Sequence, residues 1–120
     1  GFRDNEYSVT KKKNKRIAVI GDSFTMGWGV DLQDCWVKLL EKNINADDLD
    51  VEVLNLGKGG GSPVDYARIA AKAIPILKPD LVVVATLQAN DLNQLVHGYD
   101  KHPVPQVEPT PKSKFLVSKL

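Results

Sequence analysis

Three short runs of apolar, mostly β-branched residues are spread along the chain, and this pattern constrains the fold more than any other feature. The runs are "RIAVI" at residues 16–20, "VEVLNL" at residues 51–56 and "LVVVATL" at residues 81–87. The first and third are almost continuously apolar, as expected for parallel strands that are covered on both faces. The second run alternates more, which favours a strand nearer the edge of the sheet.

A helical pattern separates the first two runs. In the segment "DLQDCWVKLLEKNI", apolar residues recur at helical spacing behind Asp34, which suits a helix N-cap. Cys35 lies in the same segment, where we expect a small buried apolar residue, and a single cysteine excludes an internal disulfide. The expected packing face of this helix is Trp36, Leu39, Leu40 and Ile44.

A second helical pattern, "GSPVDYARIAAKAIPILKPD", separates the second and third runs. Ser62 suits the N-cap, Pro63 the first helical position, and Asp65 completes a capping box. Pro75 is expected to kink or end this helix, and Pro79 to stop it. The resulting β-α-β-α-β order predicts an α/β fold with a parallel sheet and right-handed crossovers.

Composition narrows the classes of protein to which the chain can belong. Its 120 residues are 42% hydrophobic and 26% charged, which is ordinary for one soluble domain. The net charge of +1 gives no support to nucleic-acid binding, and the basic cluster "KKKNKR", residues 11–16, is expected to be a solvated approach to the first strand. No apolar run is long enough to span a membrane. No metal-ligand spacing is present, so we predict no metal and no cofactor.

The chain divides into three parts. Residues 1–15 are a lead-in, residues 16–95 an α/β domain, and residues 96–120 a proline-rich linker that ends in the start of a further element. Three strands and two helices make a thin sheet, so we expect the domain to be truncated at its C-terminal side. The chain opens without Met, as an excised piece does, and the sequence leaves the cellular compartment open.

Polar residues follow each of the three runs. They are "GDS" at residues 21–23, "NLGKGGGS" at residues 55–62 and "QAND" at residues 88–91. Each is by itself compatible with an ordinary turn, because Gly, Asn, Asp and Ser are common turn residues. In an open parallel sheet, however, ligand sites lie beyond the carboxyl ends of the strands, so we expect the three segments to converge at one edge.

The residue types in these segments suit acyl transfer. Ser23 offers a hydroxyl nucleophile at the start of the segment that follows the first strand, and Gly21 is expected to permit a sharp turn before it. The glycine run leaves peptide N–H groups unshielded, and Asn90 adds a carboxamide donor. Ser23 N–H, a glycine N–H and the Asn90 amide would together form an oxyanion hole. Thr25 takes the last position of G-x-S-x-G, so this is not that nucleophile elbow.

The quoted segments resemble the first three motif blocks of the SGNH, or GDSL-type, esterase and lipase superfamily. "GDSFTMGWGV", "NLGKGGG" and "QAND" occur in the order of the family, and the resemblance covers roughly residues 14–95. By position, Ser23 matches the nucleophile, Gly60 the glycine donor and Asn90 the amide donor. The resemblance implies a three-layer α/β/α, flavodoxin-like fold.

The resemblance also implies an activity, which is the hydrolysis of a carboxylic ester through a serine acyl-enzyme. A small molecule or a short acyl group on a carbohydrate is the implied substrate. The lead-in is similar to that of some bacterial members, and an extracytoplasmic location would fit. Asp22 and Asp91 match flanking positions with structural roles. Trp28 and Asp22 are also candidates for contact with substrate, with a packing role for Trp28 weighed equally.

Two positions depart from the family pattern. Gln88 replaces the glycine of the third block, where a side chain can narrow the pocket or shift the backbone. The last block of the family, D-x-x-H, is absent. A serine hydroxyl needs a base, and the histidines present are His97 and His102. We favour surface positions for both and expect the catalytic Asp and His to lie beyond Leu120.

Two other hypotheses remain at this stage. The chain is alternatively a non-catalytic α/β module that binds a glycan or lipid in the same cleft. A homo-oligomer is also conceivable, because an unfinished sheet exposes a strand edge that a second copy can cover. Lys58, beside the glycine run, is expected to be a solvated loop residue rather than an attractor of anionic substrate.

Overall fold

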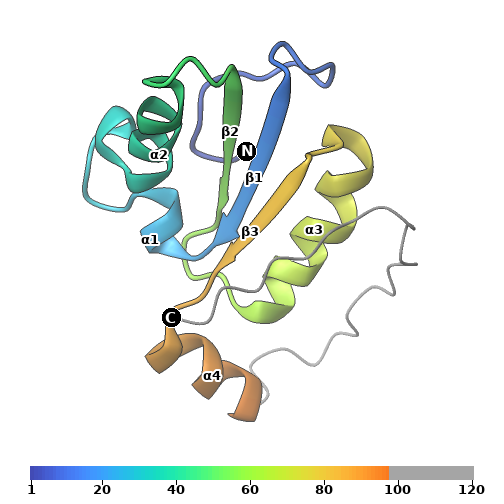
Figure 1. Cartoon of the computed structure of the whole chain (residues 1–120). Helices are drawn as coiled ribbons and strands as arrows, with labels where there is room; N and C mark the ends of the chain where they lie inside the picture. The colour runs from blue at the N-terminus through green and yellow to red at the C-terminus, as the bar shows by residue number, and fades with distance from the viewer. Residues whose placement is uncertain (98–120) are drawn as a thin grey trace.

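The computed structural model describes residues 1–97 and has a parallel sheet with helices on both faces (Figure 1). The strand order is β2-β1-β3, so the first strand lies in the middle and β2 at an edge, as predicted. The predicted α/β class is confirmed. In chain order the elements are β1 (Lys15–Gly21), α1 (Ser23–Met26), the 3₁₀ turn η1 (Leu32–Asp34), α2 (Trp36–Asn45), β2 (Val51–Gly57), α3 (Pro63–Leu77), β3 (Leu81–Ala85) and α4 (Gln88–His97).

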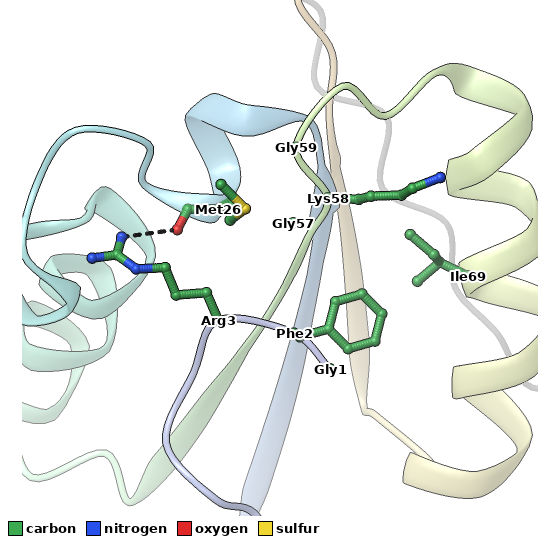
Figure 2. A pocket seen from close by; sticks show the side chains of 8 residues that line it. All are labelled: Gly1, Phe2, Arg3, Met26, Gly57, Lys58, Gly59 and Ile69. Carbon is green, nitrogen blue, oxygen red and sulfur yellow. Dashed lines mark hydrogen bonds between the residues drawn. The ribbon is translucent and has the colours of Figure 1, made fainter.

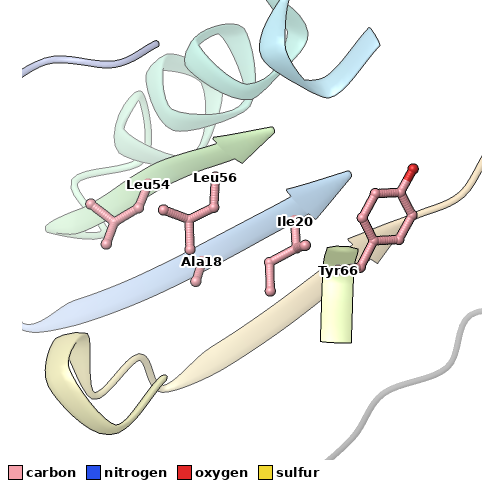
Figure 3. Packing of buried hydrophobic residues seen from close by; sticks show 5 residues of the cluster. All are labelled: Ala18, Ile20, Leu54, Leu56 and Tyr66. Atoms are coloured by element: carbon pink, nitrogen blue, oxygen red, sulfur yellow. The ribbon is translucent and has the colours of Figure 1, made fainter. Parts of the chain in front are cut away.

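Two apolar cores lie on opposite faces of the sheet, because successive side chains of a strand point to opposite sides. The core under α3 contains Ala18, Ile20, Leu54, Leu56 and Tyr66 (Figure 3). The core on the α2 face contains Val19, Cys35, Val37, Val51 and Val53. The middle strand contributes to both cores, which explains its continuous apolar run. The prediction that Cys35 is buried is confirmed.

The third strand is less covered than its sequence predicts. β3 ends at Ala85 rather than at residue 87, its other residues are half-buried, and Val84 is exposed. Within the described part of the chain, β3 pairs with β1 alone. The expectation that both faces of β3 are covered is therefore wrong for these residues. Apolar, β-branched composition favours a strand, but the neighbours that cover it decide its burial.

The helix α2 differs from its prediction in its cap and in its buried face. Asp34 belongs to η1, and Cys35 is the N-cap without a side-chain hydrogen bond. Val37 is fully buried, whereas the predicted packing residues Trp36 and Leu39 are exposed. The helix begins later than expected. The predicted residues Leu40 and Ile44 do pack against the core on this face of the sheet, together with Val37.

The helix α3 begins as predicted. The Ser62 hydroxyl accepts a hydrogen bond from Asp65 N–H, and the Asp65 carboxylate accepts one from Ser62 N–H at 3.0 Å, so the capping box is confirmed. The helix does not end at Pro75 but continues through it to Leu77. Lys78, with a φ of 47°, is the C-cap before Pro79.

The basic cluster is not merely a solvated approach, because its last residue is fully buried. Arg16 Nε donates to the Glu52 carboxylate at 2.6 Å, across the β1–β2 pair. Its terminal nitrogens donate to the carbonyls of Ser8, Val9 and Leu77 at 2.7–2.9 Å. One guanidinium therefore joins the lead-in, two strands and the end of α3. Charge patterning in the sequence does not reveal this role, because the partners come from distant segments.

Side chains of α2 close the outer edge of β2. Asn45 accepts from Val51 N–H at 2.8 Å and donates to Val51 C=O at 2.7 Å, in the manner of a neighbouring strand. Glu41 accepts from Val53 N–H at 2.9 Å, and Lys38 donates to Val53 C=O at 2.7 Å. A second copy of the chain therefore has no free edge to pair with at β2, and the predicted homo-oligomer does not gain support there.

The lead-in completes this closure. The Asp4 carboxylate accepts from Asn55 N–H at 2.6 Å and pairs with the buried Lys38 ammonium at 2.8 Å. Burial alone would lower the pKa of Lys38, but hydrogen bonds to Asp4, Tyr7 and Glu41 raise it above its ordinary value. Residues expected only to precede the domain are thus bonded to its edge strand.

Replacing Arg16 by Met is expected to lower the free energy of unfolding by about 3–5 kcal/mol, because it leaves the Glu52 charge buried without its partner. Urea unfolding followed by circular dichroism measures this change. A second substitution, Glu52→Met, should recover part of the loss. The exposed Lys12→Met is the matched control and should change stability by less than about 0.5 kcal/mol. Equal, small effects of Arg16→Met and Lys12→Met would contradict the role given to Arg16.

Candidate active site

The turn from β1 into α1 is held by Asp22. Asp22 is the N-cap of α1, and its carboxylate accepts from Phe24 N–H at 2.9 Å. Asp22 is 5% exposed, which favours the structural role of capping α1 over the predicted contact with substrate. Ser23 is the first residue of α1 and is half-buried. The candidate nucleophile therefore lies at the carboxyl edge of the sheet, directly after the central strand.

Gly21 is required for a reason that differs from the expected one. Its φ lies outside the left-handed region, so the turn itself does not demand glycine. A Cβ at this position would lie 2.1 Å from Thr25 Oγ1 and 2.9 Å from the Ala85 carbonyl oxygen. The short helix α1 therefore folds back onto the end of β1, and the absent side chain makes room for it.

Gly57, at the end of β2, makes room for α1 in the same way. A Cβ on Gly57 would lie 2.2 Å from Met26 N. This is a backbone atom, so the overlap cannot be relieved by a change of side-chain rotamer. The next residue, Lys58, donates its N–H to the Gly21 carbonyl at 2.9 Å. The loop that follows β2 is consequently bonded to the last residue of β1, at one edge of the sheet.

The glycine run forms a tight turn beside α1. Gly61 N–H donates to the Lys58 carbonyl at 2.9 Å, and Gly60 lies inside this turn with a φ of 66°. A positive φ at the third residue of a turn strongly favours glycine. A Cβ on Gly60 would meet no atom within 4 Å, so its outer side is open. Gly60 thus has no side chain to shield its peptide group, and the space that a side chain would fill is open.

The segment after β3 reaches the same edge through Asp91. This carboxylate is 1% exposed and accepts from Leu87 N–H at 2.9 Å, beside the start of α4. Asn90 lies in the first turn of α4, but its side chain, like that of His97, is outside the described part of the structure. His102 also lies outside the described residues. The predicted convergence of Asn90 with Ser23 therefore stays a prediction.

Trp28 and Phe24 surround the segment of Ser23 with exposed aromatic surface. Trp28 is 78% exposed, and its backbone N–H donates to the Ser23 carbonyl at 2.9 Å. Trp28 also lines a hollow of about 430 Å³ together with Arg3 and Met26. This exposure leaves the predicted contact between Trp28 and a substrate open to test.

Arg3 is one residue of the site region that the sequence did not single out. Its guanidinium donates to the carbonyls of Gly27 and Val30, and to that of Met26 at 3.3 Å. Figure 2 shows the contact between Arg3 and Met26 beside Gly59, and these three residues are among those that line a cavity of about 510 Å³. No motif signals Arg3, because its acceptors are backbone carbonyls of a distant turn.

Lys58 is an exposed loop residue, as expected, but its ammonium also has a partner within the chain. Its ammonium pairs with the Asp65 carboxylate at 2.5 Å, which ties the glycine run to the start of α3. Burial alone would raise the pKa of Asp65, but the hydrogen bonds from Lys58 and Ser62 lower it below its ordinary value. Lys58 therefore forms an ion pair between the loop and the first turn of α3.

Residues 1–97 hold no group of three or more His, Cys, Asp or Glu side chains placed to bind a metal ion. None of the helices in that same range is long and apolar enough to cross a bilayer.

Known structures share this architecture. The chain is similar to the crystal structure of AlinE4, described as an SGNH-hydrolase family esterase, with a TM-score of 0.56 and 23% identity over 74% of this chain and 46% of that one. It is also similar to the crystal structure of TesA, with a TM-score of 0.60 and 26% identity over 70% of this chain and 44% of that one. No protein-family model and no curated protein matches the chain.

These similarities establish the fold. The chain has an SGNH-type α/β fold, as the motif resemblance implied. It spans less than half the length of the two solved proteins.

Replacing Gly57 by Ala is expected to destabilise the fold by about 3 kcal/mol or more, because the new methyl group would overlap the backbone of Met26. Gly29→Ala is the matched control: its φ of 82° is strained for alanine, but no atom lies within 4 Å, so the loss should be about 1–2 kcal/mol. Urea unfolding compares the two variants. Equal losses would show that the close contact with α1 is not what requires glycine at Gly57.

Proposed function

We propose that this chain carries the nucleophile and the oxyanion-binding part of a carboxylic ester hydrolase of the SGNH type. Ser23 is the nucleophile in this proposal, and Ser23 N–H, Gly60 N–H and the Asn90 carboxamide are the oxyanion donors. The observation that supports it most is the bond from Lys58 N–H to the Gly21 carbonyl, since it joins the serine turn and the glycine turn at one sheet edge.

The chemistry follows from these groups. Ser23 Oγ attacks the carbonyl carbon of the ester and gives its proton to a base, while the carbonyl oxygen takes up negative charge. The C–O bond to the alcohol then breaks, the alcohol leaves with a proton, and water releases the acid from the acyl-enzyme. Each donor to the oxyanion lowers this barrier, and loss of one typically costs about 10²–10³ in rate.

We assign the general base to a group outside the described residues. Asp22 and Asp91 are unsuited to that role, because the first caps α1 and the second is bonded to Leu87 N–H and Tyr66. Without a base the serine hydroxyl is a weak nucleophile, so slow turnover by this chain alone is consistent with the proposal.

A short acyl ester, such as one on a carbohydrate, is the substrate class that we propose. Trp28 and Phe24 are exposed beside Ser23, and an exposed indole ring provides a flat apolar platform for a sugar or acyl group. The ion pair between Lys58 and Asp65 argues against a site that selects an anionic substrate through Lys58.

A fluorophosphonate probe tests the nucleophile directly, because it forms a covalent bond with an activated serine. We expect mass spectrometry to locate the adduct on Ser23, and Ser23→Ala to lose both the adduct and the turnover of p-nitrophenyl acetate. Ser8→Ala is the matched control, since Ser8 lies near Arg16, at the other end of β1. Equal turnover by wild type and Ser23→Ala, with no adduct on Ser23, would refute the proposed function.

A further inference from the structure

Tyr66 contacts two of the three segments that follow the strands. It lies in the second turn of α3, is 3% exposed, and stands at the arrowhead end of the sheet (Figure 3). Its hydroxyl lies 3.2 Å from the Gly61 carbonyl oxygen and 3.1 and 3.2 Å from the two oxygens of Asp91. One side chain thus bridges the glycine turn and the start of α4.

Each contact fixes the neighbour of a proposed oxyanion donor. Gly61 follows Gly60, and its own N–H is already held by the Lys58 carbonyl at 2.9 Å. The Tyr66 hydroxyl contacts the carbonyl oxygen of Gly61, so both the N–H and the C=O of Gly61 have a partner. Asp91 follows Asn90 in α4 and accepts from Leu87 N–H at 2.9 Å.

The Tyr66 hydroxyl is a permanent donor at this position. Burial raises its pKa well above the ordinary value for tyrosine, and the charge of Asp91 raises it further. The phenol therefore keeps its proton over the whole physiological range. The hydroxyl has one proton for three acceptor atoms. Removing the hydroxyl would leave Asp91 with Leu87 N–H as the remaining donor among the described groups.

We propose that Tyr66 is a positioning residue that sets the placement of Gly60 relative to Asn90, and with it the geometry of the oxyanion site. The proposal rests on the function proposed above. Tyr66 acts through Gly61 and Asp91 and touches no reacting atom.

Tyr66→Phe tests this assignment, with Tyr7→Phe as the matched control. Tyr7 is a half-buried phenol that also lies within hydrogen-bond distance of a carboxylate, Glu41 at 3.4 Å, but it lies against Lys38 and β2 and away from the glycine turn. We expect Tyr66→Phe to lower kcat for p-nitrophenyl acetate about 10- to 100-fold with KM within about twofold, since small displacements of catalytic groups have effects of this size. Tyr7→Phe should leave both constants unchanged.

Amide hydrogen exchange supplies a readout that does not need turnover. In Tyr66→Phe, the hydrogen-bonded amides of Gly61 and Leu87 should exchange at least about tenfold faster than in wild type, whereas Tyr7→Phe should leave them unchanged. Unchanged exchange at these amides, or an unchanged kcat in an active chain, would overturn the assignment. Absence of turnover and of a Ser23 adduct in wild type would count against the proposed function alone, and the exchange result would still decide the role of Tyr66.

If Tyr66→Phe fails to fold, the carboxylate of Asp91, which would lose the phenol as a donor, is the group to change next. The double variant Tyr66→Phe/Asp91→Asn removes that charge and keeps an acceptor for Leu87 N–H. The same two measurements then apply to the double variant, with Asp91→Asn as its reference.

Discussion

The register of β1 against β2 is the constraint on which the candidate site depends. Arg16 stands opposite Glu52 in this register, and five residues further along both strands Gly21 stands opposite Gly57. The buried ion pair specifies the pairing at one end of the sheet, and the two glycines open space for α1 at the other. A slip by one residue would bring Leu56 or Lys58 against the backbone of Met26, where even a Cβ does not fit. The position of Ser23 is therefore set by contacts at both ends of the sheet.

Local rules were sufficient where the partners are close in sequence. The capping box of Ser62 and Asp65 and the end of α3 before Pro79 depend on residues within one or two turns, and the structure has them as predicted. The strands were recognisable because their apolar runs need a sheet to bury them. The polar segments at their ends were placed at one edge by a general rule for parallel sheets, with the Asn90 side chain left untested.

Predictions from the sequence failed for residues whose contacts are with residues far away along the chain. From the sequence, Arg16 is expected to be the end of a solvated basic cluster. In the structure it is buried and donates to the carbonyls of Ser8 and Leu77. Gly21 looks like a turn residue, but its need for glycine comes from Thr25 and Ala85, which only the folded chain brings near. Tyr66 belongs to no motif, although it contacts two of the motif segments.

Positioning of the oxyanion donors and supply of the base are separable tasks in serine esterases. An oxyanion site retains part of its effect on the rate when the base is lost, because its donors are held in place before the reaction begins. In the function proposed above, the contacts that would hold these donors all lie within the described residues: Lys58 N–H to the Gly21 carbonyl, Gly61 N–H to the Lys58 carbonyl, and the Tyr66 hydroxyl to the Gly61 carbonyl. The chain spans less than half the length of the solved SGNH-fold proteins it resembles, yet it holds this network. In the function proposed above, the group that is still to be identified is the base that accepts the Ser23 proton.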